Sequence, residues 1–205
     1  MPENDMKDDR YKTLENPAEG LYKEKGSRFI AHALPAGSID EVRRHLETLR
    51  RKHHDARHHC YAYRIGEPPY QYRCNDDGEP SGTAGKPIYG QIQSYELTNL
   101  VIVVIRYFGG IKLGTGGLIQ AYRAAAKDAI THGNIIMRHW TTTLQISTDY
   151  SRMSEVMRTI KENDARILKQ EFLPDPIIAL EINKGKKEEM IQKLKSIEKV
   201  EIIVI

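Results

Sequence analysis

A glycine-rich loop that carries one lysine, Lys112–Gly117, follows an apolar run and precedes a segment with helical spacing. The first N–H groups of a helix have no partner inside the helix, and the helix dipole adds partial positive charge there. A helix that starts in this loop favours an anion such as a phosphate, with Thr115 as the expected N-cap. The candidate anion-binding residues of this segment are Arg106, Lys112, Gly114, Thr115, Gly116 and Gly117. The same spacing also fits glycines that only form a tight turn.

A second glycine-rich loop, residues 76–87, has the same arrangement. Pro87 suits the first turn of a helix, and Ser81 or Thr83 is the expected cap. Prolines 80 and 87 occupy the positions where a nucleotide P-loop needs glycine and Ser/Thr, which excludes that motif. The candidates here are Ser81, Gly82, Thr83, Gly85 and Lys86. Two such helix starts favour one shared anion-binding face, and a pair of turns without a ligand is the alternative.

The tract from His53 to Arg64 is rich in histidine and contains Cys60, which suggests zinc, but its histidine pairs are five residues apart and fit no common zinc spacing. Asp76, Asp77 and Glu79 have the oxygen ligands of a hard metal, whereas Asp77-Gly78 also fits a tight turn. We therefore assign no metal ligand, no cofactor and no catalytic residue. The secondary binding candidates are Arg57, His58, Tyr61, Arg64, Asp76, Asp77 and Glu79.

The elements that position these residues can be predicted from periodicity. The β-branched run Val101–Ile105 is typical of a buried strand, and apolar residues from Leu118 to Ala129 recur at helical spacing. Ser38 and Glu41 form a capping box before an apolar helical stripe of Ile39, Val42, Leu46 and Leu49. Tyr11–Leu14 and Leu21–Lys25 are the expected arms of a hairpin.

The chain after Gly133 alternates in the order strand, helix, strand, strand, helix, strand, which is the ferredoxin-like pattern. The expected spans are 140–147, 151–163, 165–172, 177–183, 186–197 and 200–205. We place the domain boundary near Arg138. The predicted class is α+β with two domains, residues 1–138 and 139–205.

Composition limits the possible functions. The chain has 205 residues, 40% of them hydrophobic, and a formal net charge of only +3. Residues 26–138 carry 15 Lys+Arg against 10 Asp+Glu, so the excess positive charge lies in the first domain. Two cysteines without a Cys-x-x-Cys motif suit a reducing compartment. The polar amino terminus is no secretory signal, and no apolar run reaches the roughly 20 residues of a membrane span. We expect a cytoplasmic protein with no membrane association.

Four segments together resemble the IMPACT family in its bacterial YigZ-like branch. They are KGSRF (25–29), DDGEPSGTAG (76–85), RYFGG (106–110) and LGTGGL (113–118), and the resemblance covers the first two-thirds of the chain. It implies a first domain with the ribosomal protein S5 domain 2-like fold, which domain IV of elongation factor G also has, and a ferredoxin-like second domain. It implies no settled activity.

Three classes of function follow. The favoured one is a non-enzymatic protein that binds RNA or the ribosome through a basic face of the first domain, with tyrosines that stack on bases. The second is a regulator with a protein partner. Eukaryotic family members resemble translation regulators, but they use an additional RWD domain that we do not find in this chain. The third is an enzyme on a phosphorylated small molecule, as the kinases of similar fold suggest. Sequence alone leaves the oligomeric state open.

Overall fold

The computed structural model describes residues 9–172 and 175–205; residues 1–8 and 173–174 lie outside the described part. The chain divides into two compact units, of which Tyr11–Arg138 is the first. The second unit holds His139–Ile205 together with Asp9 and Arg10. Asp9 joins it because its backbone carbonyl accepts from the Trp140 N–H at 2.6 Å and its carboxylate from the Gly185 N–H at 2.9 Å. Both units combine helices with strands, so the class is α+β, as predicted.

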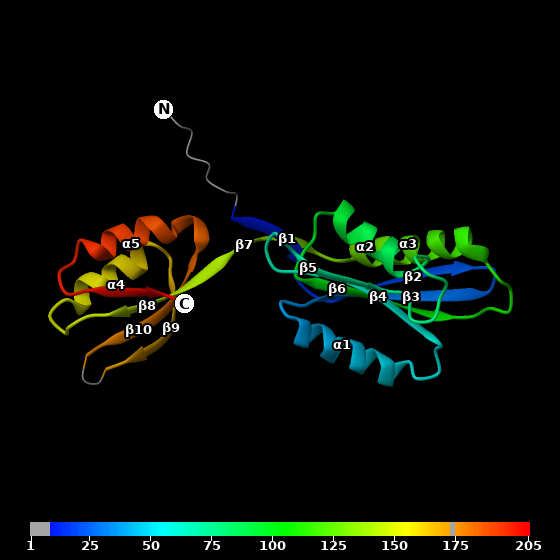
Figure 1. Ribbon diagram of the computed structural model, residues 1–205, viewed down its shortest axis with the longest axis horizontal. Coiled ribbons are helices and arrows are strands. Elements are labelled where there is room, and N and C mark those ends of the chain that lie inside the picture. Colours follow the sequence, from blue (N-terminus) through cyan, green and yellow to red (C-terminus); the bar gives the residue numbers. More distant parts are fainter. Residues whose placement is uncertain (1–8, 173–174) are drawn as a thin grey trace, which may run out of the picture. The chain divides into compact units, whose positions relative to one another are not determined.

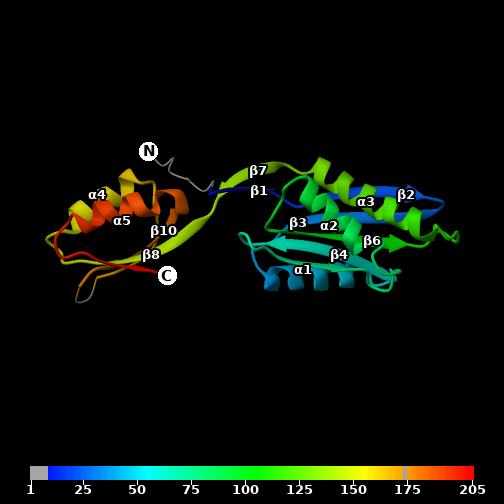
Figure 2. The ribbon, with the colours of Figure 1, turned by 45° about the horizontal axis from the view of Figure 1, so that its top comes forward.

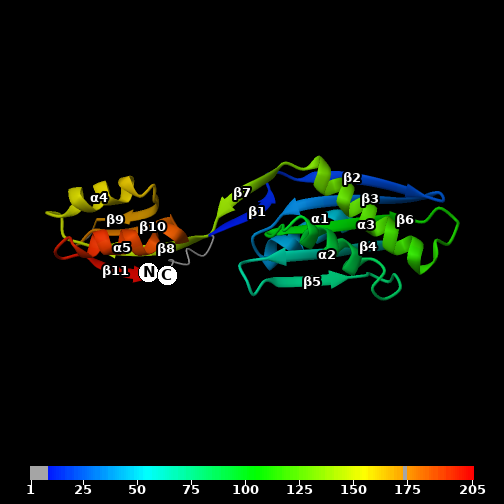
Figure 3. The same cartoon turned by 90° about the horizontal axis from the view of Figure 1, so that it is seen from above.

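The first unit is built on a five-stranded sheet in the order β2-β3-β6-β4-β5, which Figure 3 shows from above. All of its pairings are antiparallel. The bounds are β2 Ala18–Glu24, β3 Ser27–Pro35, β4 His58–Ile65, β5 Gln71–Asn75 and β6 Leu100–Tyr107. The run Val101–Ile105 forms the middle of the central strand β6, and each of its residues is fully buried. This confirms the strand predicted there.

Helices cover both faces of this sheet. Helix α1 (Ile39–Lys52) lies on one face, whereas α2 (Gly85–Ser94) and α3 (Gly114–His132) lie on the other (Figures 1 and 2). The alternation of side chains along the strands therefore gives two hydrophobic cores. The core under α2 and α3 includes Phe29, Cys60 and Tyr122, and the core under α1 includes Tyr61 and Val103.

Helix α1 forms as the capping box and apolar stripe predict. The Ser38 side chain accepts from the Glu41 N–H at 3.2 Å. The Glu41 carboxylate reaches one residue further back than expected and accepts from the Gly37 N–H at 2.6 Å. Val42, Leu46 and Leu49 are buried against the sheet.

The hairpin predicted at the amino-terminal side is wrong. Strand β1 (Arg10–Leu14) pairs with β7 (Ile135–His139), and β2 pairs with β3. Both segments do form strands, but they do not pair with each other. The partner of β1 is far away in the sequence, and the partner of β2 is the strand that follows it. Local pattern cannot choose between such partners, because pairing depends on the tertiary fold.

The second unit has the predicted element order. Its sheet has the strand order β11-β8-β10-β9, with the helices on one face (Figure 1). The bounds are β8 Thr141–Ser147, α4 Met153–Glu162, β9 Arg166–Glu171, β10 Ile177–Asn183, the short 3-10 helix η1 Lys184–Lys186, α5 Lys187–Lys195 and β11 Glu201–Val204. Its core includes Leu144, Val156 and Met190. No helix in the described part of the chain is long and apolar enough to cross a membrane.

Candidate nucleic-acid interface

The amino terminus of α3 is open. The helix begins at Gly114, directly after Leu113, and no side chain caps it. Thr115 lies inside the first turn, so its expected role as the N-cap is wrong. Lys112 and residues 114–116 are exposed. The first N–H groups of this helix therefore face solvent beside one cation, which is the arrangement that favours an anion.

The amino terminus of α2 is already occupied by an anion of the chain itself. The Asp76 carboxylate accepts from the backbone N–H of Gly82 at 2.8 Å, of Ala84 at 2.9 Å and of Gly85 at 2.8 Å. Burial raises the pKa of Asp76, but these three donors outweigh it and hold the pKa below its usual value. The expected caps are wrong: the Thr83 hydroxyl donates to the Pro80 carbonyl, and Ser81 is exposed.

Arg106 does not lie on an open face, in contrast to the prediction. Its Nη1 lies 2.7 Å from Glu79 Oε1, and only 8% of the Arg106 side chain and 4% of the Glu79 side chain are exposed. The same carboxylate oxygen accepts from the Tyr122 hydroxyl at 2.8 Å. Tyr122 in turn accepts from Cys60 Sγ at 3.2 Å. The Arg106 charge is neutralised inside the unit, because a buried cation needs a buried partner.

The rest of the acidic loop also serves the fold. Asp77-Gly78 forms the predicted tight turn, closed by a hydrogen bond from Glu79 N to Asp76 O at 2.9 Å. The Asp77 carboxylate accepts from the His59 N–H at 2.7 Å, and the Asp77 carbonyl lies 2.8 Å from His58 Nδ1. Asp76, Asp77 and Glu79 thus each bind a different set of partners within the fold. Within the described residues, no three His, Cys, Asp or Glu side chains are placed to hold a metal ion.

A groove runs between α2 and α3, on the face of the sheet that these two helices cover. This α2–α3 groove has a volume of about 550 Å³. Its lining contains two cations, Lys86 and Arg123, and no carboxylate. Gly90 borders it with no atom within 4 Å of where a Cβ would lie. The residues that line the groove are Gly82, Lys86, Pro87, Gly90, Gln91, Ile119 and Arg123.

Gly82 and Lys86 were predicted site residues, whereas the contribution of α3 beyond its first turn was missed. Ile119 and Arg123 are four residues apart, so they lie on one helix face. That spacing is visible in the sequence, but only the structure shows that this face lies opposite α2.

The secondary candidates are distributed over both faces of the sheet. Tyr61 is buried under α1 and cannot stack on a ligand. Arg57 is exposed. Arg64 lies on the opposite face from Tyr61, where its guanidinium carbon lies 3.5 Å from the centre of the Tyr70 ring.

The family assignment follows from comparison with known proteins. The model of the Impact N-terminal domain matches residues 25–130, about half of the chain. The chain is 35% identical over 153 residues to the IMPACT family member YvyE of Bacillus subtilis. The aligned segment covers 75% of this chain and 70% of that protein.

The chain belongs to the IMPACT family. The IMPACT family member YigZ of Escherichia coli is 31% identical over 172 residues, which is 83% of this chain and 84% of that protein. A solved structure described as a crystal structure of an hypothetical protein superposes with a TM-score of 0.76 at 28% identity. It covers 96% of this chain and 98% of its own. The matched Impact N-terminal domain contains the Asp76 cap, the Arg106–Glu79 pair and the α2–α3 groove.

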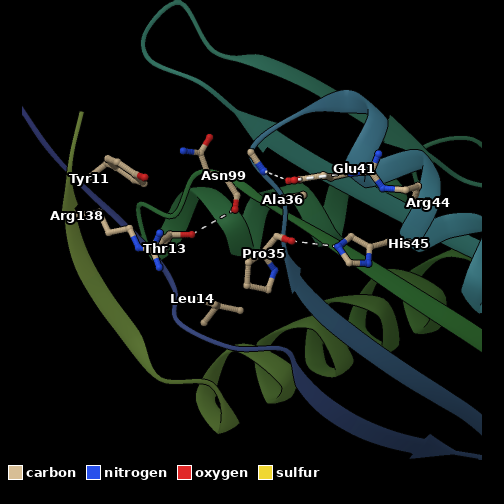
Figure 4. Close-up of a pocket in the computed structure, with 11 residues that line it drawn as sticks. Tyr11, Thr13, Leu14, Pro35, Ala36, Glu41, Arg44, His45, Asn99 and Arg138 are labelled. Atoms are coloured by element: carbon tan, nitrogen blue, oxygen red, sulfur yellow. Dashed lines mark hydrogen bonds and ion pairs between the residues drawn. The ribbon is translucent and has the colours of Figure 1, made fainter. Parts of the chain in front are cut away.

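A separate cavity of about 480 Å³ lies between the start of α1 and the strands β1 and β7 (Figure 4). Its lining contains two arginines, of which Arg44 lies 3.8 Å from Glu41, which also accepts from the backbone of Gly37. His45 Nε2 lies 3.1 Å from the Pro35 carbonyl. Several polar groups of this cavity are paired with one another, and none of the predicted site residues lines it. The residues that line it are Tyr11, Thr13, Leu14, Pro35, Ala36, Gly37, Glu41, Arg44, His45, Asn99 and Arg138.

Proposed function

We propose that this IMPACT family protein is a non-enzymatic RNA- or ribosome-binding protein with a role in regulating translation, and that it holds an RNA backbone in the α2–α3 groove. The observation that carries the proposal is the charge of the groove lining, which has two cations and no carboxylate. Within the described residues, neither Lys86 nor Arg123 forms an ion pair or a side-chain hydrogen bond with a carboxylate, although the Lys86 charge helps to lower the pKa of Asp76. Unpaired cations in a groove favour a polyanion over a neutral ligand.

The open end of α3 extends this site. The second and third turns of α3 line the groove, and the start of the same helix offers backbone N–H groups and one more cation. The residues at this start are Lys112, Gly114, Thr115, Gly116 and Gly117. Gly116 has no atom within 4 Å of a Cβ position, so packing does not require glycine there. A glycine without a packing reason is consistent with close approach of a phosphate to the backbone.

The proposed site is therefore narrower than the one expected from sequence. Arg106 is excluded because Glu79 neutralises it, and the N–H groups of Gly82 and Gly85 are excluded because Asp76 accepts from them. Lys86 remains, and Ser81 remains as an exposed hydroxyl in the loop that precedes α2.

We also propose that the first unit has the ribosomal protein S5 domain 2-like fold and the second the ferredoxin-like fold. The strand order β11-β8-β10-β9, with α4 and α5 on one face of the sheet, supports the ferredoxin-like fold for the second unit. The likeness of the first to a domain of elongation factor G supports a ribosomal setting only by analogy, because a fold does not determine a function.

The test is the affinity of the full chain for a fluorescently labelled single-stranded RNA of mixed sequence, measured by anisotropy at low salt. Lys86→Gln together with Arg123→Gln should weaken binding by at least about tenfold per cation lost, the scale of a charge-assisted hydrogen bond. The loss should be equal for different sequences, because phosphate contacts carry no sequence information.

The matched control removes two charges from the other face of the sheet. Arg43 and Arg51 are exposed on α1, where they pair with Asp40 and Glu47 of the same helix. Arg43→Gln with Arg51→Gln should change affinity less than threefold. Absence of RNA binding by the natural chain at low salt would refute the proposal, and an equal loss in the control would refute the location.

A further inference from the structure

A cluster of one arginine and three tyrosines lies beside the α2–α3 groove. The tyrosine patch consists of Arg64 on β4, Tyr70 and Tyr72 at β5, and Tyr89 on α2. Tyr72 and Tyr89 are stacked, with ring centres 4.9 Å apart and an interplanar angle of 21°. Arg64 lies over the Tyr70 ring at 3.5 Å. Arg64 and Tyr72 are direct partners across β4 and β5, so both side chains lie on the face that carries α2.

One ring of the patch, that of Tyr72, is exposed to solvent, and the other three side chains are partly buried. Tyr72 is 62% exposed although one face of its ring contacts Tyr89. Strand β5 is an edge strand of the sheet, so no further strand covers Tyr72. The Arg64 Nε atom is buried with no hydrogen-bond partner. A planar guanidinium and an exposed tyrosine ring are groups on which nucleic-acid bases stack.

Helix α2 joins the patch to the groove. Lys86 and Tyr89 are three residues apart, and Lys86 and Gly90 are four apart, so both are neighbours of Lys86 on the helix surface. Lys86 therefore lies between the Tyr72–Tyr89 stack on one side and the groove that Gly90 and Arg123 line on the other. A strand whose phosphates contact Lys86 has its bases within reach of the rings.

We infer that the tyrosine patch is a stacking platform for the unpaired bases of a single-stranded nucleic acid whose backbone lies in the α2–α3 groove. The inference rests on the proposed function and narrows its ligand from RNA in general to single strands. In a duplex the bases stack on one another, and the rings have no free base face to contact. The platform accepts any base, because each has a π face.

The experiment compares a labelled single-stranded RNA with the same strand annealed to its complement. The full chain should bind the single strand at least about tenfold more tightly. Tyr72→Ala should weaken single-strand binding by roughly 5- to 150-fold, the measured scale for loss of one stacked base, and leave duplex binding unchanged. Tyr72→Phe keeps the ring and should restore affinity to within about twofold. Tyr150→Ala, which removes a tyrosine 57% exposed in the second unit, is the control and should have no effect.

A second measurement does not depend on a variant. Ultraviolet cross-linking of the natural chain to a 4-thiouridine-substituted strand should label the peptide that contains Tyr72 or the one that contains Tyr89. Equal affinity for duplex and single strand, full affinity of Tyr72→Ala, or cross-links elsewhere would overturn the platform while the groove stands. If Lys86→Gln with Arg123→Gln also binds normally, the proposed function fails as well.

Discussion

Glu79 is the residue at which the structure makes its most demanding prediction about stability. Its carboxylate is 4% exposed and accepts from both the Arg106 guanidinium and the Tyr122 hydroxyl. Glu79→Ala would leave the buried Arg106 cation without a counter-charge and the Tyr122 hydroxyl without its acceptor. If the acidic loop were only a turn, the same change would cost almost nothing.

The magnitude follows from the burial of both partners. Breaking a buried pair by removing one partner costs about 3–5 kcal/mol, because the remaining charge stays desolvated. We expect a loss of about 4 kcal/mol of unfolding free energy, which corresponds to a fall in melting temperature of roughly 10–20 °C for a unit of this size. Glu79→Leu with Arg106→Met removes both charges, so it should be much less destabilising than the single change.

Scanning calorimetry of the full chain is the appropriate assay, because the two units can unfold in separate transitions. Only the transition of the first unit should shift. Glu47→Ala removes an exposed carboxylate 3.5 Å from Arg51 and should cost less than about 1 kcal/mol. A loss below about 1 kcal/mol for Glu79→Ala, or equal losses for the single and double variants, would refute the buried pair.

Three further outcomes follow from the described contacts. Asp76→Ala removes the acceptor of three backbone N–H groups and should lower the free energy of unfolding by about 2 kcal/mol in urea titrations. Asp76→Asn should be less destabilised, and equal stability of the natural chain and both variants would contradict the cap. Burial lowers the pKa of His32 and of His59, so below about pH 6.5 the unfolded chain binds more protons than the folded chain. The free energy of unfolding should therefore fall as the pH is lowered, by up to about 1.4 kcal/mol per pH unit for each histidine. A flat profile from pH 7.5 to 5.5 would contradict this. Gly109→Ala would place Cβ 1.9 Å from the Gly26 carbonyl carbon and should destabilise the first unit strongly, whereas Gly116→Ala meets no atom within 4 Å and should leave its melting temperature within a few degrees of the natural chain.

The parts of the fold that were predictable have a strong local signal. The capping box of α1, the buried run of β6 and the alternation of the second unit each identify an element without reference to the rest of the chain. The hairpin of β1 and β2 was wrong because β1 pairs with the distant strand β7 and β2 pairs with β3, the strand that follows it. The same limit applies to β7, which no pattern indicated.

The site was predictable only in part, for a related reason. Sequence spacing placed a helix start in each of the two glycine-rich loops, but it gave the wrong caps and could not show that Asp76 fills one of the starts. Nor could it show that Glu79 and Arg106, 27 residues apart, form a buried pair. Arg123 and the tyrosine patch come together only when α2 packs against α3 and β5, so no motif contains them.

The salt dependence of RNA binding tests the central claim most directly. When cations of the α2–α3 groove neutralise phosphates of a single strand, the counterions condensed on those phosphates are released. A plot of log affinity against log salt concentration should therefore have a slope of about −0.7 for each neutralised phosphate, which gives about −2 for three contacts. Lys86→Gln with Arg123→Gln should flatten the slope to about −0.7, whereas Arg43→Gln with Arg51→Gln should leave it near −2. A natural chain whose affinity does not change with salt, or a groove variant whose slope stays near −2, would contradict the account.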